Sequence, residues 1–167
     1  MDFNNRVTII TGGIDSGKTS WCAGKYRLEN MDGILSLKVL SCGKRVGYNI
    51  ERITTGETFA FARTKDFLPK GWNEAYSYGM FSFSREAFEM VSRWFRSFSE
   101  SIDTVVIDEV GPLELKELGF FRQVKSVLEN NEKFKKIYIV VRRGLVEKVC
   151  LKFNIKKYST VTIDNYS

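Results

Sequence analysis

The sequence predicts an α/β fold in three layers, with a mainly parallel β-sheet flanked by helices and an antiparallel β insert after the first helix. Short apolar, β-branched runs typical of buried strands alternate with segments of helical period. The first of these strands stops at a glycine turn that leads into a helix. Between residues 34 and 63, strand-like runs are joined by short glycine-containing links, which favour hairpins.

The first strand is predicted at 6–10 ("RVTII"), and it stops at "TGG". A helix should follow at 18–30, because no proline interrupts this segment and four of its residues recur with helical period: Trp21, Cys22, Lys25 and Leu28. Gly33 is expected to break the chain before the next strand.

The insert is predicted to contain strands at 34–40, 45–53 and 58–63, which would extend one edge of the sheet. Residues 66–79 are predicted to form a loop. Ser84 is a plausible N-cap for a helix at 86–98, whose apolar stripe is expected to face the core: Phe88, Val91, Phe95 and Phe98.

The second half of the chain returns to alternating strands and helices. A strand at 104–107 should end in a turn at 111–115, and the following helix, at 116–130, would use an apolar face made of Leu118, Phe121, Val124 and Leu128. The remaining predicted elements are a strand at 136–141, a helix at 144–153 and a strand at 159–163.

Length and composition set limits on the class of protein. A chain of 167 residues with 43% hydrophobic content can bury the core of one ordinary domain, so residues 1–167 are expected to form a single domain. No segment reaches the roughly 18 apolar residues of a membrane helix, and the N-terminus does not resemble a signal peptide. We therefore expect a cytoplasmic protein with no membrane partner.

The cysteines and the charge give weaker indications. Cys22, Cys42 and Cys150 form no C-x-x-C pair, which argues against a disulfide framework or a zinc site, and all three are expected to be at least half-buried. The formal charge of +6 is spread along the chain. It permits a nucleic-acid partner without indicating one.

The strongest chemical motif is "GGIDSGKT" at 12–19, which fits the phosphate-binding pattern G-x-x-x-x-G-K-[ST] and lies between a predicted strand and a predicted helix. In such a P-loop, backbone N–H groups surround phosphate oxygens at a helix N-terminus. Lys18 would reach the β and γ phosphates, and the Thr19 hydroxyl would bind Mg²⁺. The candidate nucleotide-binding residues are Gly12, Gly13, Ile14, Asp15, Ser16, Gly17, Lys18, Thr19 and Ser20.

A P-loop needs a second metal anchor on a neighbouring strand, and the predicted strand "TVVI" supplies a candidate where it ends in the adjoining Asp108 and Glu109. Asp108 is the expected second protein ligand of Mg²⁺, and Glu109 could polarise a water aimed at the γ phosphate. With Lys18, Glu109 is the candidate catalytic residue. The same stretch also reads as Asp108-x-x-Gly111, which is typical of a GTPase switch.

A guanine-specific enzyme would be expected to carry an [NT]-K-x-D element. The nearest string is Thr64-Lys65-Asp66, in which the acid comes one position early. We therefore favour the ATPase-like interpretation, in which Gly111-Pro112 is a sharp turn that re-aims Glu109.

In these motifs the chain resembles the THEP1-type nucleoside triphosphatases, from about Arg6 to Arg143. The resemblance rests on the P-loop, on "GKRVGYNI" and "GETFAFAR" in the insert, and on "VVIDEVGPLEL" before a helix with Phe120 and Phe121. It implies one P-loop domain that uses Mg²⁺ to hydrolyse ATP, GTP and other triphosphates to the diphosphate and phosphate, with broad base tolerance. It also implies phosphate and metal roles for Lys18 and Thr19, a metal role for Asp108 and a water-orienting role for Glu109.

The chain departs from the family in two places. Relatives often have G-K-Y before the central helix, whereas this chain has Gly79-Met80-Phe81. Relatives also tend to end the 136–141 strand with a Thr-x-His type of sequence, but this protein has no histidine and offers Arg142 and Arg143. Either arginine is a candidate stabiliser of charge on the transferred phosphoryl group, or an ordinary surface residue.

Two other classes of function stay open. One is a P-loop kinase for a nucleoside, a nucleotide or another small metabolite, whose arginine-bearing lid could come only from residues 62–79. The other is a nucleotide-binding, RNA-associated module, supported by charge and by the exposed-looking Trp72 and Tyr76. The sequence leaves the oligomeric state undetermined, and we favour a monomer.

Overall fold

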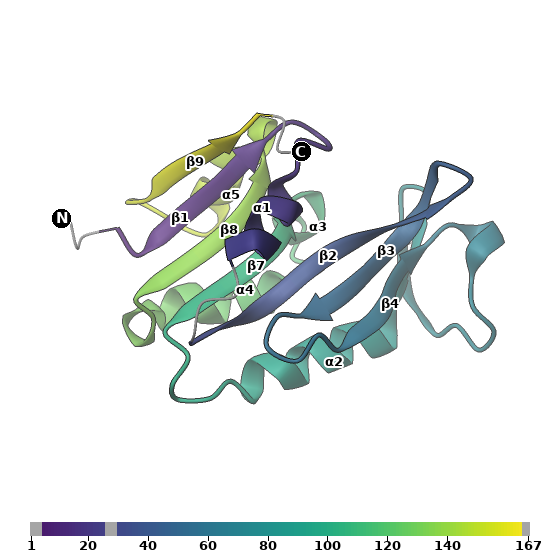
Figure 1. Cartoon of the computed structure of the whole chain (residues 1–167), viewed down its shortest axis with the longest axis horizontal. Helices are drawn as coiled ribbons and strands as arrows, with labels where there is room; N and C mark the ends of the chain where they lie inside the picture. The colour runs from purple at the N-terminus through teal and green to yellow at the C-terminus, as the bar shows by residue number, and fades with distance from the viewer. Residues whose placement is uncertain (1–4, 26–29, 165–167) are drawn as a thin grey trace.

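The computed structural model describes residues 5–25 and 30–164. The described strands form one nine-stranded sheet in the order β5-β6-β4-β3-β2-β7-β8-β1-β9 (Figure 1). The predicted α/β class and the antiparallel insert at one edge are therefore confirmed.

Five strands make up the parallel part of this sheet: β2 (Met31–Ser41), β7 (Thr104–Val110), β8 (Lys136–Arg142), β1 (Val7–Gly12) and β9 (Ser159–Ile163). The sequence suggested that the strand carrying Asp108 would neighbour the strand that leads into the P-loop. That expectation is wrong, because β8 lies between β1 and β7. The P-loop and Asp108 must therefore meet across an intervening strand.

The antiparallel part consists of β3 (Lys44–Arg52), β4 (Thr58–Arg63), β6 (Phe81–Ser84) and β5 (Glu74–Tyr78). Its first pairing uses β2, which is parallel to β7 on one side and antiparallel to β3 on the other. The insert therefore continues the parallel sheet through a shared strand.

The prediction of a loop at 66–79 is wrong in its last part. A 3₁₀ turn at Lys65–Phe67 is followed by β5, which pairs with the unpredicted strand β6. Tyr76 stacks on Phe83 and Phe88, with ring centroids 5.5 Å from each. Hairpin pairing with β6 and packing on α2 thus make a strand of a segment whose local sequence is rich in turn formers.

Gly33 does not separate two elements, as expected, but lies inside β2. Its φ is +139°, and a Cβ at this position would lie 2.0 Å from the carbonyl oxygen of Val106 on β7. A side chain would therefore push β2 and β7 apart, so glycine here permits close pairing of the two strands.

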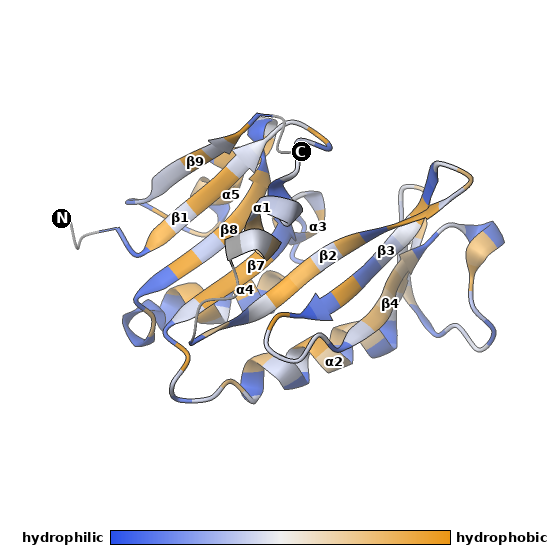
Figure 2. Cartoon of the chain, in the orientation of Figure 1, coloured by the Kyte–Doolittle hydropathy of each residue, from blue (hydrophilic) through white to orange (hydrophobic). Residues whose placement is uncertain are grey.

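The helices cover the two faces of the sheet unequally. Helix α1 (Lys18–Lys25) lies in front of the sheet in Figure 1, and helices α2 (Arg85–Arg96), α4 (Phe121–Glu129) and α5 (Val146–Lys152) lie behind it. Figure 2 shows apolar strands between these layers. The larger core cluster lies on the side of α2, α4 and α5, and the smaller one includes Ile10, Leu35 and Cys22 of α1.

Several helix boundaries differ from the predicted ones. The predicted turn at 111–115 contains a short helix, α3 (Pro112–Leu115), and the helix predicted from 116 begins only at Phe121. A 3₁₀ turn at Arg143–Leu145 precedes α5. Leu28, expected in the first helix, lies outside the described residues, and Leu118 is an exposed residue ahead of α4.

The N-cap of α2 and the burial of the cysteines were both predicted from the sequence. The Ser84 hydroxyl accepts a hydrogen bond from the Ala87 N–H at 3.2 Å, which confirms the predicted N-cap of α2. Cys22 and Cys150 are buried, but Cys42 is exposed in the β2–β3 hairpin, contrary to expectation.

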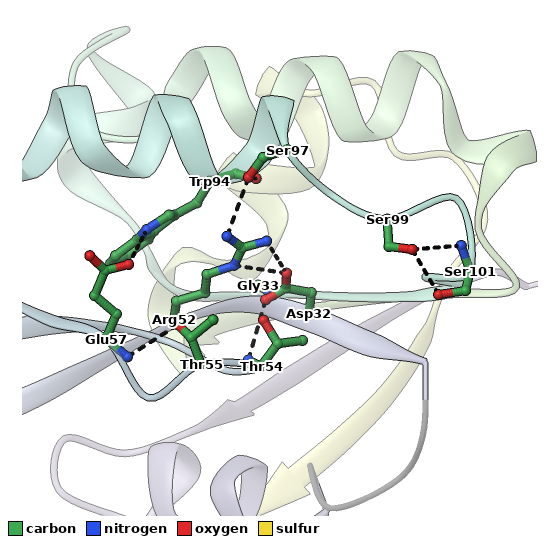
Figure 3. Close-up of polar contacts among 10 residues, drawn as sticks. All are labelled: Asp32, Gly33, Arg52, Thr54, Thr55, Glu57, Trp94, Ser97, Ser99 and Ser101. Carbon is green, nitrogen blue, oxygen red and sulfur yellow. Dashed lines mark hydrogen bonds and ion pairs between the residues drawn. The ribbon is translucent and has the colours of Figure 1, made fainter.

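A buried ion pair fixes the start of the insert to helix α2. Asp32 is 1% exposed, and its Oδ2 accepts hydrogen bonds from Nε and Nη2 of Arg52 at 2.9 and 2.7 Å. Figure 3 shows the same guanidinium reaching Ser97 at the end of α2, through a hydrogen bond of 3.2 Å. The pair thus joins β2, β3 and α2.

No helix within residues 5–25 and 30–164 combines the length and the apolar character needed to cross a membrane.

Candidate functional site

The P-loop connects the end of β1 to the start of α1. Within it Asp15 and Gly17 have positive φ values of 60° and 88°, so the backbone curls before it enters the helix. Gly12 lies where a Cβ would be 2.2 Å from the carbonyl oxygen of Ile163 on β9. The end of β1 therefore approaches β9 closely, and a side chain at 12 would displace the start of the loop.

Lys18 lies folded over this loop. Its ammonium donates to the carbonyl oxygen of Gly13 at 2.5 Å, and to the carbonyl oxygen of Gly12 and the hydroxyl oxygen of Ser16 at 3.4 Å each. Lys18 is 7% exposed. Burial lowers the pKa of Lys18, while the charges of Glu109 and Asp108 raise it. The ammonium is held at the loop by neutral oxygen acceptors, which an anion could replace.

Asp108 is completely buried at the end of β7. Its Oδ2 accepts a hydrogen bond from the Thr19 hydroxyl at 2.8 Å and another from the Ser36 N–H at 3.0 Å. Its Oδ1 is buried and has no hydrogen-bond partner in the described part of the chain. Burial raises the pKa of Asp108 to about 7, with a further contribution from the charge of Glu109.

A cation would satisfy this arrangement. A carboxylate with one unpartnered oxygen beside a threonine hydroxyl offers the hard oxygen ligands that Mg²⁺ prefers. A divalent ion would also offset the cost of the buried charge, since nearby positive charge stabilises the ionised form. The residues present therefore fit the metal that the motif implies.

Glu109 lies on a β-bulge and not on a regular strand. Ile107 of β7 pairs with Ile139 of β8, but Val110 pairs with Val141, so β7 carries one extra residue. The extra residue coincides with a φ of +61° at Glu109. The bulge, and not the expected turn at Gly111-Pro112, therefore lets Glu109 face the P-loop side although Asp108 precedes it directly.

The two candidate arginines lie in different places relative to the pocket. Arg142, at the end of β8, lies 3.6 Å from Glu109 Oε2 through its Nη2 and lines the same pocket. Arg143 instead forms an exposed ion pair with Asp164 and does not line that pocket. Of the pair, Arg142 alone is brought to the site.

These groups surround a pocket of about 400 Å³. The P-loop contributes the lining residues from Ile14 to Ser20, and the ends of β7 and β8 contribute Glu109 and Arg142. Gly12 and Gly13 do not line the pocket, and their carbonyls contact Lys18 instead. The remaining lining residues were not selected from the sequence as site residues: Ser36, Leu37, Lys38, Arg45 and Tyr48.

Lys38 and Arg45 make the pocket more cationic than the sequence indicated. Lys38 on β2 forms an ion pair with Asp15 of the P-loop. The Arg45 guanidinium lies 5.5 Å from the ring centroid of Tyr48, and its buried Nε has no hydrogen-bond partner among the described residues. Arg45 belongs to the segment "GKRVGYNI", one of those that carry the family resemblance, so the sequence could have indicated it as a site residue. Lys38 is one of many lysines in the chain, and no motif marks it.

The Asp108-x-x-Gly111 interpretation requires Gly111 near the pocket. The Gly111 N–H instead donates to Glu114 Oε2 at 2.8 Å at the start of α3, and Gly111 is absent from the pocket lining. The Gly111 backbone is thus occupied as a helix cap, which favours the interpretation of the stretch through Asp108 and Glu109.

Comparison with known proteins agrees with this geometry. A family model described as NTPase matches residues 7–166. Nucleoside-triphosphatase THEP1 of Archaeoglobus fulgidus is 25% identical over 150 residues, 87% of this chain and 85% of that protein. Nucleoside-triphosphatase THEP1 of Thermococcus kodakarensis is 29% identical over 146 residues, 83% of this chain and 77% of that protein.

Two solved structures share the fold. A solution structure of a human cancer-related nucleoside triphosphatase superposes with a TM-score of 0.65 and 21% identity, over 94% of this chain and 88% of that one. The crystal structure of THEP1 from Aquifex aeolicus gives a TM-score of 0.63 and 18% identity, over 95% and 89% of the two chains.

Proposed function

Because the protein belongs to this NTPase family, we propose that it hydrolyses nucleoside triphosphates to the diphosphate and phosphate, with Mg²⁺ as cofactor and with little preference among bases. The observation that carries the proposal is the contact of Asp108 Oδ2 with the hydroxyl of Thr19. It joins the end of β7 to the P-loop across the intervening strand β8.

The P-loop would hold the phosphates. Its backbone N–H groups and the N-terminus of α1 favour anions, and Lys18 would exchange its carbonyl contacts for β and γ phosphate oxygens. Thr19 and Asp108 would hold Mg²⁺, which when bound neutralises charge on the phosphates. Lys38 and Arg45 add positive charge to the same pocket.

Glu109 would act as the base. From the bulge its carboxylate can orient a water and accept its proton as the water oxygen bonds to the γ phosphorus and the bond to the bridging oxygen breaks. Arg142 contacts Glu109 and lines the pocket, so it would stabilise negative charge on the transferred phosphoryl group.

Broad base tolerance is supported by the location of the closest guanine-type string. Thr64, Lys65 and Asp66 lie at the end of β4 in the insert and do not line the pocket. The pocket lining is dominated by groups that suit phosphate, which all triphosphates share.

The RNA-associated alternative loses its aromatic support. Trp72 donates through Nε1 to Ser82 Oγ at 2.8 Å, and the Tyr76 hydroxyl accepts from the Gly119 N–H at 2.9 Å. Both side chains are half-buried and make hydrogen bonds within the fold.

The segment expected to form a kinase lid, residues 62–79, lacks a free arginine. Arg63 is the sole arginine of this segment, and it donates hydrogen bonds to the Tyr48 carbonyl oxygen and to Asn49 Oδ1.

The proposal is tested by phosphate release from ATP, GTP, CTP and UTP at fixed Mg²⁺. Turnover should depend on Mg²⁺, and the rates for ATP and GTP should differ by less than about a hundredfold. Lys18→Ala should abolish turnover in a folded protein, because it removes the lysine aimed at the β and γ oxygens. Undiminished turnover in Lys18→Ala, or a preference of several thousandfold for GTP, would contradict the proposal.

A further inference from the structure

A second cavity of about 320 Å³ adjoins the nucleotide pocket. The two share five lining residues, Ser36, Arg45, Tyr48, Glu109 and Arg142. The second cavity has no lining residue from the P-loop and extends under the insert, between β3, β4, β6 and α3. We call it the insert cavity.

The shared residues place the insert cavity next to the expected position of the terminal phosphate. A triphosphate held by the P-loop would bring its γ phosphate to Lys18 and Thr19, in the pocket that Glu109 also lines. The insert cavity reaches the same carboxylate from residues outside the P-loop. A molecule there would occupy the position of the attacking group, where hydrolysis uses water.

The walls of the insert cavity suit a flat aromatic molecule. Five aromatic side chains line it: Tyr48, Phe61, Tyr78, Phe81 and Phe83. Tyr48 and Phe81 meet edge to face at 5.6 Å, and Phe61 and Phe83 do so at 5.2 Å. Such surfaces bind planar rings through stacking and edge contacts.

The polar groups of the cavity lie at its junction with the nucleotide pocket. Arg45 lies over the ring of Phe81, 5.9 Å from its centroid, and keeps a buried Nε–H without a partner among the described residues. Glu109 supplies a half-exposed carboxylate at the same place. Glu114 contributes little, because both of its oxygens accept backbone N–H groups at 2.8 Å.

We propose that the insert cavity binds a nucleoside, whose base lies among the aromatic side chains and whose hydroxyl points to Glu109, and that this hydroxyl accepts the γ phosphoryl group. The oxygen of the hydroxyl bonds to the γ phosphorus, the bond to the bridging oxygen breaks, and Glu109 takes the hydroxyl proton. The products are a nucleoside monophosphate and a nucleoside diphosphate. This assignment rests on the proposed triphosphate site and adds a second substrate to it.

A hydroxyl fits the junction better than an anionic acceptor. Glu109 is a carboxylate that can take a proton from a hydroxyl, and it would repel the phosphate of a nucleoside monophosphate. Residues 62–79 supply no free arginine for a lid. The charge of the γ phosphate would instead be met by Arg142, which is paired with Glu109 and lines both cavities. The Arg45 guanidinium, which lines both cavities, can donate to a neutral oxygen of the sugar or base.

The experiment uses the full chain with ATP labelled in the γ phosphate, Mg²⁺ and one of five nucleosides: adenosine, guanosine, cytidine, uridine or thymidine. Label in phosphate and label in nucleoside monophosphate are measured together. We expect at least one nucleoside to take up label saturably, at a rate about tenfold or more above phosphate release, because a bound acceptor competes with water.

A cavity-filling variant links transfer to this site. Met80 is 62% exposed at the cavity wall, so Met80→Trp should obstruct the cavity without disturbing the core. The ratio of nucleoside phosphorylation to phosphate release should fall about tenfold or more. The matched control is Leu151→Trp, an 85% exposed position on α5, which should keep the parent ratio.

The outcomes separate the two proposals. If phosphate is released but none of the five nucleosides takes up label, the acceptor site is overturned and hydrolysis stands. If a nucleoside takes up label but no phosphate forms in its absence, hydrolysis is overturned and the acceptor site stands. The acceptor site would also be overturned if label passed to an added nucleoside monophosphate but to none of the nucleosides. An unchanged ratio of nucleoside phosphorylation to phosphate release in Met80→Trp would overturn it too.

Discussion

Asp108 and Glu109 adjoin in the chain but lie in different environments. The bulge in β7 leaves Asp108 fully buried against Thr19 and Ser36, and it leaves Glu109 half-exposed toward Arg142. One extra residue in a strand thus divides the proposed metal ligand from the proposed base.

The first prediction at the residue scale concerns these two carboxylates. Glu109→Gln should lower single-turnover hydrolysis by roughly two to four orders of magnitude while Mg²⁺-triphosphate binding stays near normal, because only a base is lost. Asp108→Asn should weaken Mg²⁺-dependent binding as well as rate, because it removes the charge proposed to face the metal. Binding and single-turnover rates of both variants are compared. Hydrolysis at the parent rate in Glu109→Gln would mean that another group holds the water.

The second prediction separates the two arginines. Arg142→Ala should lower the hydrolysis rate by about two to three orders of magnitude, comparable to losing one charge-stabilising donor. Arg143→Ala is the matched control and should stay near the parent rate, because Arg143 forms an exposed ion pair with Asp164. Steady-state rates at saturating triphosphate make the comparison. Equal losses in both variants would contradict the assignment of Arg142.

At the scale of elements, α3 fixes the chain after the bulge. Glu114 of α3 is buried, and its two oxygens accept the N–H groups of Gly111 and Phe120. One side chain therefore holds both the turn that leaves β7 and the start of α4. Burial raises the pKa of Glu114 to about 7, against an ordinary value of 4.5.

This shift predicts a pH dependence of stability. Between about pH 4.5 and pH 7 the folded protein keeps a proton on Glu114 that the unfolded chain has lost. The contribution of Glu114 is therefore fully present below pH 4.5 and is lost as the pH rises through 7. Through Glu114, the free energy of unfolding of the parent should fall by up to ~1 kcal/mol for each pH unit of increase over this range. Glu114→Gln should remove this part of the fall.

Urea unfolding at several pH values from 5 to 7 measures this slope for the parent, Glu114→Gln and the control Glu132→Gln. Glu132 is exposed, so its replacement should leave the parent slope unchanged. The prediction fails if the slopes of the parent and Glu114→Gln coincide.

At the scale of the whole molecule, the insert shares strand β2 with the parallel sheet. The ion pair of Asp32 with Arg52 adds a buried connection between β2 and β3, and Arg52 also reaches Ser97 after α2. An insert joined in this way has no separate core, since the larger cluster contains residues of both parts, such as Phe61 and Ile139.

We therefore predict that the chain unfolds in one cooperative transition, as a single domain should. Trp21→Phe leaves Trp72 and Trp94, of the insert and α2, as the fluorescent reporters, while far-ultraviolet circular dichroism follows the whole chain. The urea midpoints from the two signals should coincide. Separate midpoints would show that the insert unfolds on its own.

The sequence by itself determined the class of fold, and it predicted most of the residues that line the candidate site. The P-loop spacing, the Asp108-Glu109 pair and the alternation of strands and helices are local patterns, because turns, caps and periodicity depend on residues close in the chain. The N-cap at Ser84 and the hairpins after Gly33 were readable for the same reason.

Only the tertiary structure decided how these parts meet. The position of β8 between β1 and β7, the bulge at Glu109, and the placing of Arg142 but not Arg143 at the pocket all depend on strand order and register. So do the places of Lys38 and Arg45 in the pocket, which they share with the P-loop and Glu109. Long-range pairing is decided by burial and packing of the whole sheet, which no short stretch of sequence contains.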